Sequence, residues 1–252
     1  MEPVIHGKIL EALALKRWQT QYDLYLWLKK EVSLSRIHEG VRDLESVRMV
    51  VWREAGMAPS GLIKKEYSLT FWGLVAAVTL SGECWEKIDE VARNYPDLLP
   101  LVFGKWNLFK EIGIPAIVAL RSAFLGIYCG LDLHENSPLY IFTPSLLNLP
   151  ITQEALLGSI RPIEEVIKGL NPPPIGRIIQ RLKKSRLFLQ NEGEVGKFVT
   201  KIILKFLLIF DPEKTGKVLT KDQELRELVR EIKGEEERSL SKHLSLWKKV
   251  KL

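Results

Sequence analysis

Residues 33–54 read SLSRIHEGVRDLESVRMVVWRE, and this stretch decides the predicted fold. Apolar residues in its first half recur at spacings of three and four: Leu34, Ile37, Val41 and Leu44. That spacing predicts a helix over 34–46 that buries one stripe, with Ser33 as a good N-cap. Residues 48–54 are rich in β-branched and aromatic side chains, which predicts a strand.

The flanking segments extend this pattern in both directions. Before it, helices are predicted over 7–15 and 21–30. After it, a loop is predicted over 55–61, a return strand over 62–69 and a further helix over 71–80. Thr20 and Thr70 are candidate N-caps for the helices that follow them, and the loop holds two glycines and a proline. Three helices, a β-hairpin and a fourth helix follow the order of a winged helix-turn-helix domain.

Two motifs carry a resemblance to a known family. Residues 33–50 (SLSRIHEGVRDLESVRMV) resemble the recognition-helix segment of winged-helix transcriptional regulators of the MarR/ArsR/PadR type, in which a Leu-Glu pair, here Leu44-Glu45, closes the helix. Residues 67–73 (YSLTFWG) resemble the segment that ends the wing and opens the next helix. The resemblance covers about 80 residues. It implies binding to double-stranded DNA and a role in transcription regulation.

The same resemblance implies two groups of DNA contacts. Helix 34–46 is expected in the major groove, with these side chains toward the bases: Ser35, Arg36, His38, Glu39 and Arg42. Gly40 is expected on the same polar face, where it would allow close backbone approach. Arg53, Lys64 and Lys65 are expected on the wing, near backbone phosphates. Arginine can bond a guanine edge at two atoms, which gives this face a means of reading sequence.

Net charge is unevenly distributed along the chain. Residues 1–80 carry +2, residues 81–172 carry −4 and residues 173–252 carry +8. The modest charge of the first segment leaves open a winged helix that binds protein instead of DNA. The last segment holds a possible second basic patch, formed by Arg177, Arg181, Lys183, Lys184 and Arg186. That patch fits either further phosphate contacts or the solvated face of a packed helix.

The rest of the chain predicts a mainly α protein. Of the 252 residues, 46% are hydrophobic and 27% are charged, a composition typical of globular proteins. Almost every segment beyond the hairpin has a helical pattern, and Asn171-Pro-Pro-Pro174 is the strongest break. We therefore expect a winged-helix domain over 1–82, a helical domain over 83–172 and a basic helical C-terminal region over 173–252.

No motif for catalysis or metal binding is convincing. The sequence contains no phosphate-binding Gly-rich loop, GxSxG elbow or HExxH motif, so we expect no enzyme and no cofactor. Residues 211–222 resemble a calcium loop only weakly, because three lysines would repel a cation, and a helix-loop-helix bend at Gly216 is expected instead. Cys129, Asp132 and His134 lack a second ligand pair for zinc. We expect no metal.

Partners and location follow from similar considerations. Two cysteines and no secretory signal pattern favour the cytoplasm. The apolar stretches 112–131 and 198–210 are interrupted by charges, so buried helices are expected and no membrane partner.

A homodimer is expected, as for most helix-turn-helix proteins, and the C-terminal helices could bind a protein partner. An interaction scaffold in a larger assembly is the alternative function; RNA binding through Trp52 or Tyr67 ranks lower.

Overall fold

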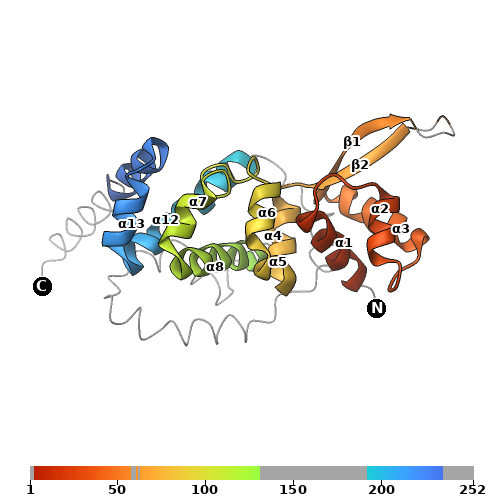
Figure 1. Cartoon of the computed structure of the whole chain (residues 1–252), viewed down its shortest axis with the longest axis horizontal. Helices are drawn as coiled ribbons and strands as arrows, with labels where there is room; N and C mark the ends of the chain where they lie inside the picture. Colours follow the sequence, from red (N-terminus) through yellow and green to blue (C-terminus); the bar gives the residue numbers. More distant parts are fainter. Residues whose placement is uncertain (1–2, 58–60, 62, 131–191, 235–252) are drawn as a thin grey trace, which may run out of the picture.

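The computed structural model describes residues 3–57, 61, 63–130 and 192–234 (Figure 1). This part of the chain is mainly helical and contains a single two-stranded antiparallel sheet. Three helices precede the sheet and further helices follow it. The predicted mainly α class is therefore confirmed, and the order of the first six elements is compatible with a winged helix.

The N-terminal elements lie close to their predicted bounds. They are α1 (Pro3–Leu15), α2 (Gln21–Leu28), α3 (Leu34–Ser46), β1 (Val50–Met57), β2 (Ile63–Leu69) and α4 (Phe71–Leu80). Strand β1 begins two residues later than predicted because Arg48 adopts a left-handed conformation with φ of 54°. The amides of Arg48 and Met49 donate to the carbonyl oxygens of Glu45 and Leu44, so these two residues cap the C-terminus of α3.

Two of the three predicted N-caps act through their side chains. Thr20 and Asp23 form a reciprocal capping box at the start of α2, in which Thr20 Oγ1 accepts from the Asp23 amide and Asp23 Oδ2 accepts from the Thr20 amide. Thr70 Oγ1 accepts from the Gly73 amide at 3.2 Å. Ser33 occupies the N-cap position of α3 but makes no capping bond, because its hydroxyl pairs with that of Ser35 at 3.1 Å.

The hairpin is tied to the segment that joins α1 to α2. Trp52 pairs with Tyr67 and Arg53 with Glu66 in the β1–β2 register. Gln19 forms an antiparallel bridge with Tyr67, with backbone N–O distances of 3.0 and 2.8 Å, and so adds a minimal third strand at the base of the hairpin. This bridge fixes where the hairpin leaves the helical body.

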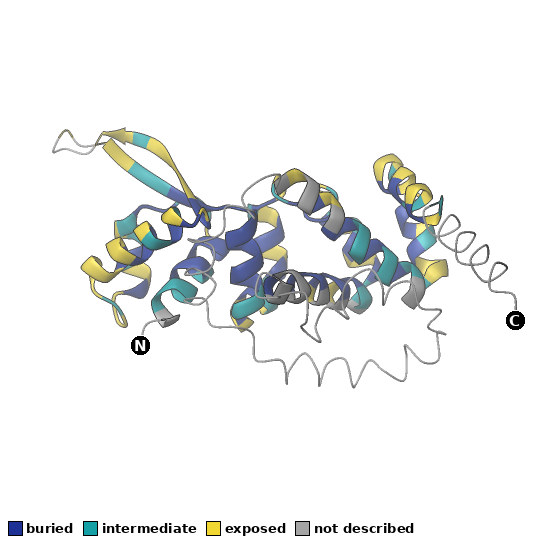
Figure 2. Cartoon of the chain, turned by 180° about the vertical axis from the view of Figure 1, so that it is seen from behind, coloured by how far each residue is buried: buried dark blue, intermediate teal, exposed yellow. Residues whose placement is uncertain are grey.

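Beyond the hairpin the described chain is helical. The elements are α5 (Gly82–Glu86), α6 (Ile88–Asn94), α7 (Trp106–Ile112), α8 (Ile114–Gly130), α12 (Glu192–Phe210), α13 (Pro212–Leu219) and a last helix over 223–234. Helix α4 is central: it is buried from Phe71 to Val78, and it packs against α1 and against α8. Figure 2 shows buried residues continuing from the N-terminal helices through α4 into α8 and α12.

The expected bend at Gly216 is wrong. Gly216 lies inside α13, and the chain turns instead between α13 and the last helix. Asp211 caps α13 through the amide of Lys214, and Asp222 caps the following helix through the amide of Leu225. The two carboxylates that resembled calcium ligands therefore begin two different helices.

Several predictions fall outside the described residues. The second basic patch at 177–186 and the predicted boundary at 171–174 lie there, as do Asp132 and His134. In the described ranges, no group of three or more His, Cys, Asp or Glu side chains is arranged to hold a metal ion. Each helix within these ranges is too short or too polar to cross a membrane.

Candidate nucleic-acid interface

Helix α3 presents a polar face to solvent. The five side chains predicted for the major groove are all exposed: Ser35, Arg36, His38, Glu39 and Arg42. Their exposure follows from helical spacing, because the buried positions lie on the opposite side of the same helix. Figure 1 shows the β1–β2 hairpin extending away from the helical body beside α2 and α3.

The buried face of α3 differs from the prediction at two positions. Leu34, expected in the core stripe, is the first residue of α3 and is 37% exposed. Gly40, expected on the polar face, is buried, and a Cβ built there would lie 2.6 Å from Ile9 Cδ1 of α1. The close approach that this glycine allows is therefore between α1 and α3, and Gly40 does not reach the polar face.

Two side chains anchor α3 to its surroundings. Asp43 Oδ2 lies 3.4 Å from His6 Nε2 of α1. Trp52 Nε1 of β1 donates to Glu45 Oε1 at 2.8 Å. Glu45, predicted to close the helix, thus also links α3 to the hairpin. Helix α3 is thus bonded to α1 through Asp43 and to β1 through Glu45.

The predicted wing cations have different environments. Arg53 donates to Glu66 Oε2 from Nε at 3.1 Å and from Nη2 at 2.9 Å, and it stacks on the Trp18 ring at 4.2 Å. Lys65 Nζ lies 3.7 Å from the centre of the Trp52 ring. Lys64 is exposed and forms no ion pair within the described part of the chain. Of the three, Lys64 is the most accessible to a phosphate.

The register pairs two basic residues of the wing with acidic ones. Arg53 lies opposite Glu66, and Lys65 lies opposite Glu54. Opposite charges directly across an antiparallel pair stabilise the hairpin modestly. The pattern of alternating residues in the two strands would give these pairs only if the bulge between Glu54 and Met57 were taken into account.

Sequence reasoning missed two residues that organise the base of the wing. Arg17 donates to both carboxylate oxygens of Asp97, at 2.6 and 2.8 Å, and to the hydroxyl of Ser68 in β2 at 3.1 Å. Trp18 has a left-handed φ of 59°, and its ring supports Arg53. Nothing in the local pattern marks them, because their partners are distant in sequence.

Further exposed cations border α3. Lys29 and Lys30 follow α2, and Arg48 follows α3 in its left-handed conformation. These residues add positive charge at both ends of the exposed polar face. Tyr67, one of the two aromatics considered for RNA stacking, is 5% exposed and its hydroxyl lies 3.3 Å from Gln21 Nε2. It is therefore a core residue of the hairpin base.

No known protein family, curated protein or solved structure matches this chain.

Proposed function

We propose that this chain is a winged-helix protein that binds double-stranded DNA, with α3 in the major groove and the β1–β2 hairpin against the backbone. The observation that carries the proposal is the exposed polar face of α3. Its five side chains are solvent-accessible while Asp43 and Glu45 anchor the helix at its sides. A rigidly held helix with an exposed arginine-containing face suits the reading of base edges.

Groups other than the five side chains of this polar face are candidates for contacts with DNA phosphates. The first amides of α3 lack a side-chain cap, since the Ser33 hydroxyl pairs with Ser35. Unpaired amides at a helix N-terminus favour a phosphate. On the wing we assign this role mainly to Lys64, with Lys65 beside it, and we assign Arg53 to holding the hairpin through Glu66 and Trp18.

The proposed role is that of a cytoplasmic transcriptional regulator acting as a homodimer. Two copies related by a twofold axis would place their α3 helices in successive major grooves, about 34–36 Å apart. The C-terminal helices are the proposed source of the dimer contact or of a surface for another protein. Sedimentation velocity of the full chain tests the dimer independently of DNA.

Fluorescence anisotropy with random duplex DNA at several salt concentrations tests DNA binding. A linear fall of log affinity with log salt concentration is expected, because phosphate contacts release counterions. Selection from a random pool would then give the preferred site. On that site Arg36→Ala and Arg42→Ala should each cost about 1–3 kcal/mol and relax the preference at defined base pairs. Arg93→Ala, which changes an exposed arginine of α6, is the matched control.

A protein-interaction scaffold is the second candidate, and one observation favours it. Helix α2 exposes three large side chains: Tyr22 at 59%, Leu26 at 44% and Trp27 at 50%. Exposed apolar groups of this size on one short helix are typical of protein interfaces. Absence of DNA binding even at low salt would exclude the first candidate. Leu26→Ser and Trp27→Ser would then show whether α2 supports self-association or capture of a partner.

A further inference from the structure

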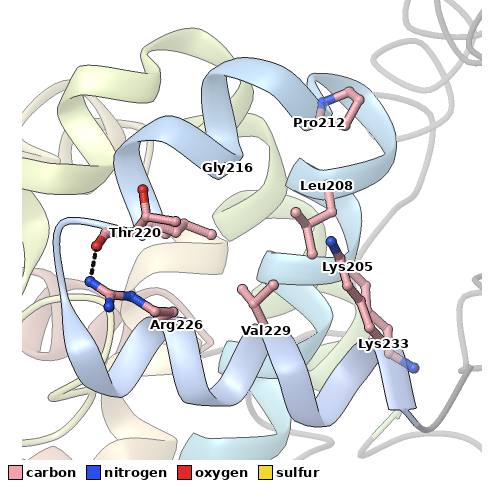
Figure 3. A pocket seen from close by; sticks show the side chains of 9 residues that line it. Lys205, Leu208, Pro212, Gly216, Thr220, Arg226, Val229 and Lys233 are labelled. Carbon is pink, nitrogen blue, oxygen red and sulfur yellow. Dashed lines mark hydrogen bonds between the residues drawn. The ribbon is translucent and has the colours of Figure 1, made fainter.

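A pocket of about 310 Å³ lies far along the chain from α3. It is formed by α12, α13 and the helix over 223–234, as Figure 3 shows. Small-molecule sites usually have volumes of about 300–1,000 Å³, so this pocket falls at the lower end of that range. It has no part in the DNA interface proposed above.

The described lining of the pocket is cationic. Lys205, Arg226 and Lys233 contribute to it, and no Asp or Glu is among the described lining residues. Arg226 donates to the carbonyl oxygen of Thr220, a contact drawn in Figure 3, which holds the guanidinium at the wall and leaves other N–H donors. Neither lysine forms an ion pair with a described residue. An anion bound in the pocket would therefore find cationic partners in its lining.

The remaining lining residues are mostly apolar. Leu208, Pro212, Leu219 and Val229 line the pocket. In the view of Figure 3, Arg226 lies toward one end, Lys205 and Lys233 toward the other, and Val229 between them. A ligand that fills this space therefore needs an apolar body as well as a negative charge.

Gly216 lines the pocket without a side chain. It lies inside α13, where glycine costs about 1 kcal/mol relative to alanine. A Cβ built on Gly216 would meet no atom within 4 Å, and its φ is not positive, so neither packing nor backbone geometry requires glycine. Since Gly216 lines the pocket, a side chain there would occupy space that is now empty.

We propose that this pocket binds a small organic anion, namely a carboxylate that carries a short aliphatic chain. The carboxylate would pair with Lys205 and Lys233 at one end, while the chain lies against Leu208, Leu219 and Val229. This inference goes beyond the proposed function and does not depend on DNA binding.

Isothermal titration calorimetry of the full chain tests the proposal with three probes: octanoate, octanol and inorganic phosphate. Octanoate should saturate one site, and the other two should bind at least tenfold more weakly, because each lacks either the charge or the apolar chain. Lys205→Gln and Lys233→Gln should each weaken octanoate binding about tenfold, since each removes a charged partner. Lys217→Gln, on the exposed side of α13 beside Glu213, is the control and should leave binding unchanged.

Gly216→Leu separates loss of binding from loss of folding. Leucine favours the helix, so the variant should melt no lower than the wild type while octanoate binding is abolished. Gly193→Leu, at an exposed glycine of α12, should leave binding intact. The proposal is overturned if millimolar octanoate does not bind, if octanol binds equally well, or if Gly216→Leu and the lysine variants bind octanoate like the wild type.

Discussion

Arg17 and Asp97, eighty residues apart, form a two-point ion pair with N–O distances of 2.6 and 2.8 Å. The same guanidinium donates to Ser68 of β2 and to the carbonyl oxygen of Asn94, and it stacks on the Tyr95 ring at 4.9 Å. The end of α1, the base of the hairpin and the segment after α6 therefore meet at one side chain. We infer that residues 83–97 stabilise the N-terminal unit.

Replacement of Arg17 by lysine should lower the free energy of unfolding by about 1–2 kcal/mol. Lysine cannot reproduce the two-point geometry, although the half-exposed Asp97 limits the effect through solvent screening. The hydrogen bonds from Arg17 hold the pKa of Asp97 below its usual 3.8. The stabilisation by the Arg17–Asp97 ion pair is thus complete above pH 3.8, and it is lost as the pH falls through the lower pKa of Asp97 in the folded state.

Urea unfolding at neutral and acid pH measures this effect. The curves of the wild type and Asp97→Asn should differ at pH 7 and converge below pH 3.8. Arg93→Ala serves as the control, since Arg93 donates from an exposed site to a backbone carbonyl of its own helix. A constant difference at all pH values would contradict a role for the ionised carboxylate.

Gly73→Ala should destabilise the chain by about 1–3 kcal/mol or more. A Cβ at Gly73 would lie 2.0 Å from the backbone oxygen of Met49, which also accepts a hydrogen bond from the Thr70 amide and so cannot move without disturbing the start of α4. Gly7→Ala, in α1, adds a methyl group to open space and should leave stability unchanged or raise it. Thermal melting of the pair checks the contrast. Similar melting temperatures for both variants would refute the close approach of the Met49 backbone to α4.

Lys64→Ala should weaken DNA binding almost equally on all sequences and reduce the salt slope by about one. The reason is that Lys64 is exposed on the hairpin and is assigned to a phosphate, which carries no sequence information. Arg42→Ala, in contrast, should change the preferred sequence. Anisotropy titrations with a selected site and a scrambled site measure both effects. A Lys64→Ala variant that alters sequence preference would argue against a backbone contact.

Cys84 should resist alkylation by iodoacetamide at pH 8.5 in the folded protein. Burial raises the pKa of its thiol to about 11, so little thiolate forms at that pH, and the side chain is fully buried. A Cys129→Ser background isolates the signal for mass spectrometry. Labelling should become fast in 6 M guanidinium chloride, and rapid labelling without denaturant would show that α5 opens easily.

The helix over 34–46 and the helix over 71–80 could be predicted to the residue, because their spacing, caps and length agree. The exposed polar face of α3 was predictable for the same reason. The position of Gly40 was also predictable from the sequence. It lies three residues after Ile37 and four before Leu44, so helical spacing alone places it on the buried side.

The sequence by itself determined the local elements: the order of helices and hairpin, the Thr20 and Thr70 caps, and which side of α3 is polar. These depend on propensity and on periodicity within a few residues. Only the tertiary structure decided that Arg53 is paired with Glu66 over Trp18, that Arg17 joins α1 to Asp97, and that Gly216 borders a cationic pocket. Those contacts form between segments far apart in sequence, so their geometry is set by helix packing and strand register, which local patterns do not encode.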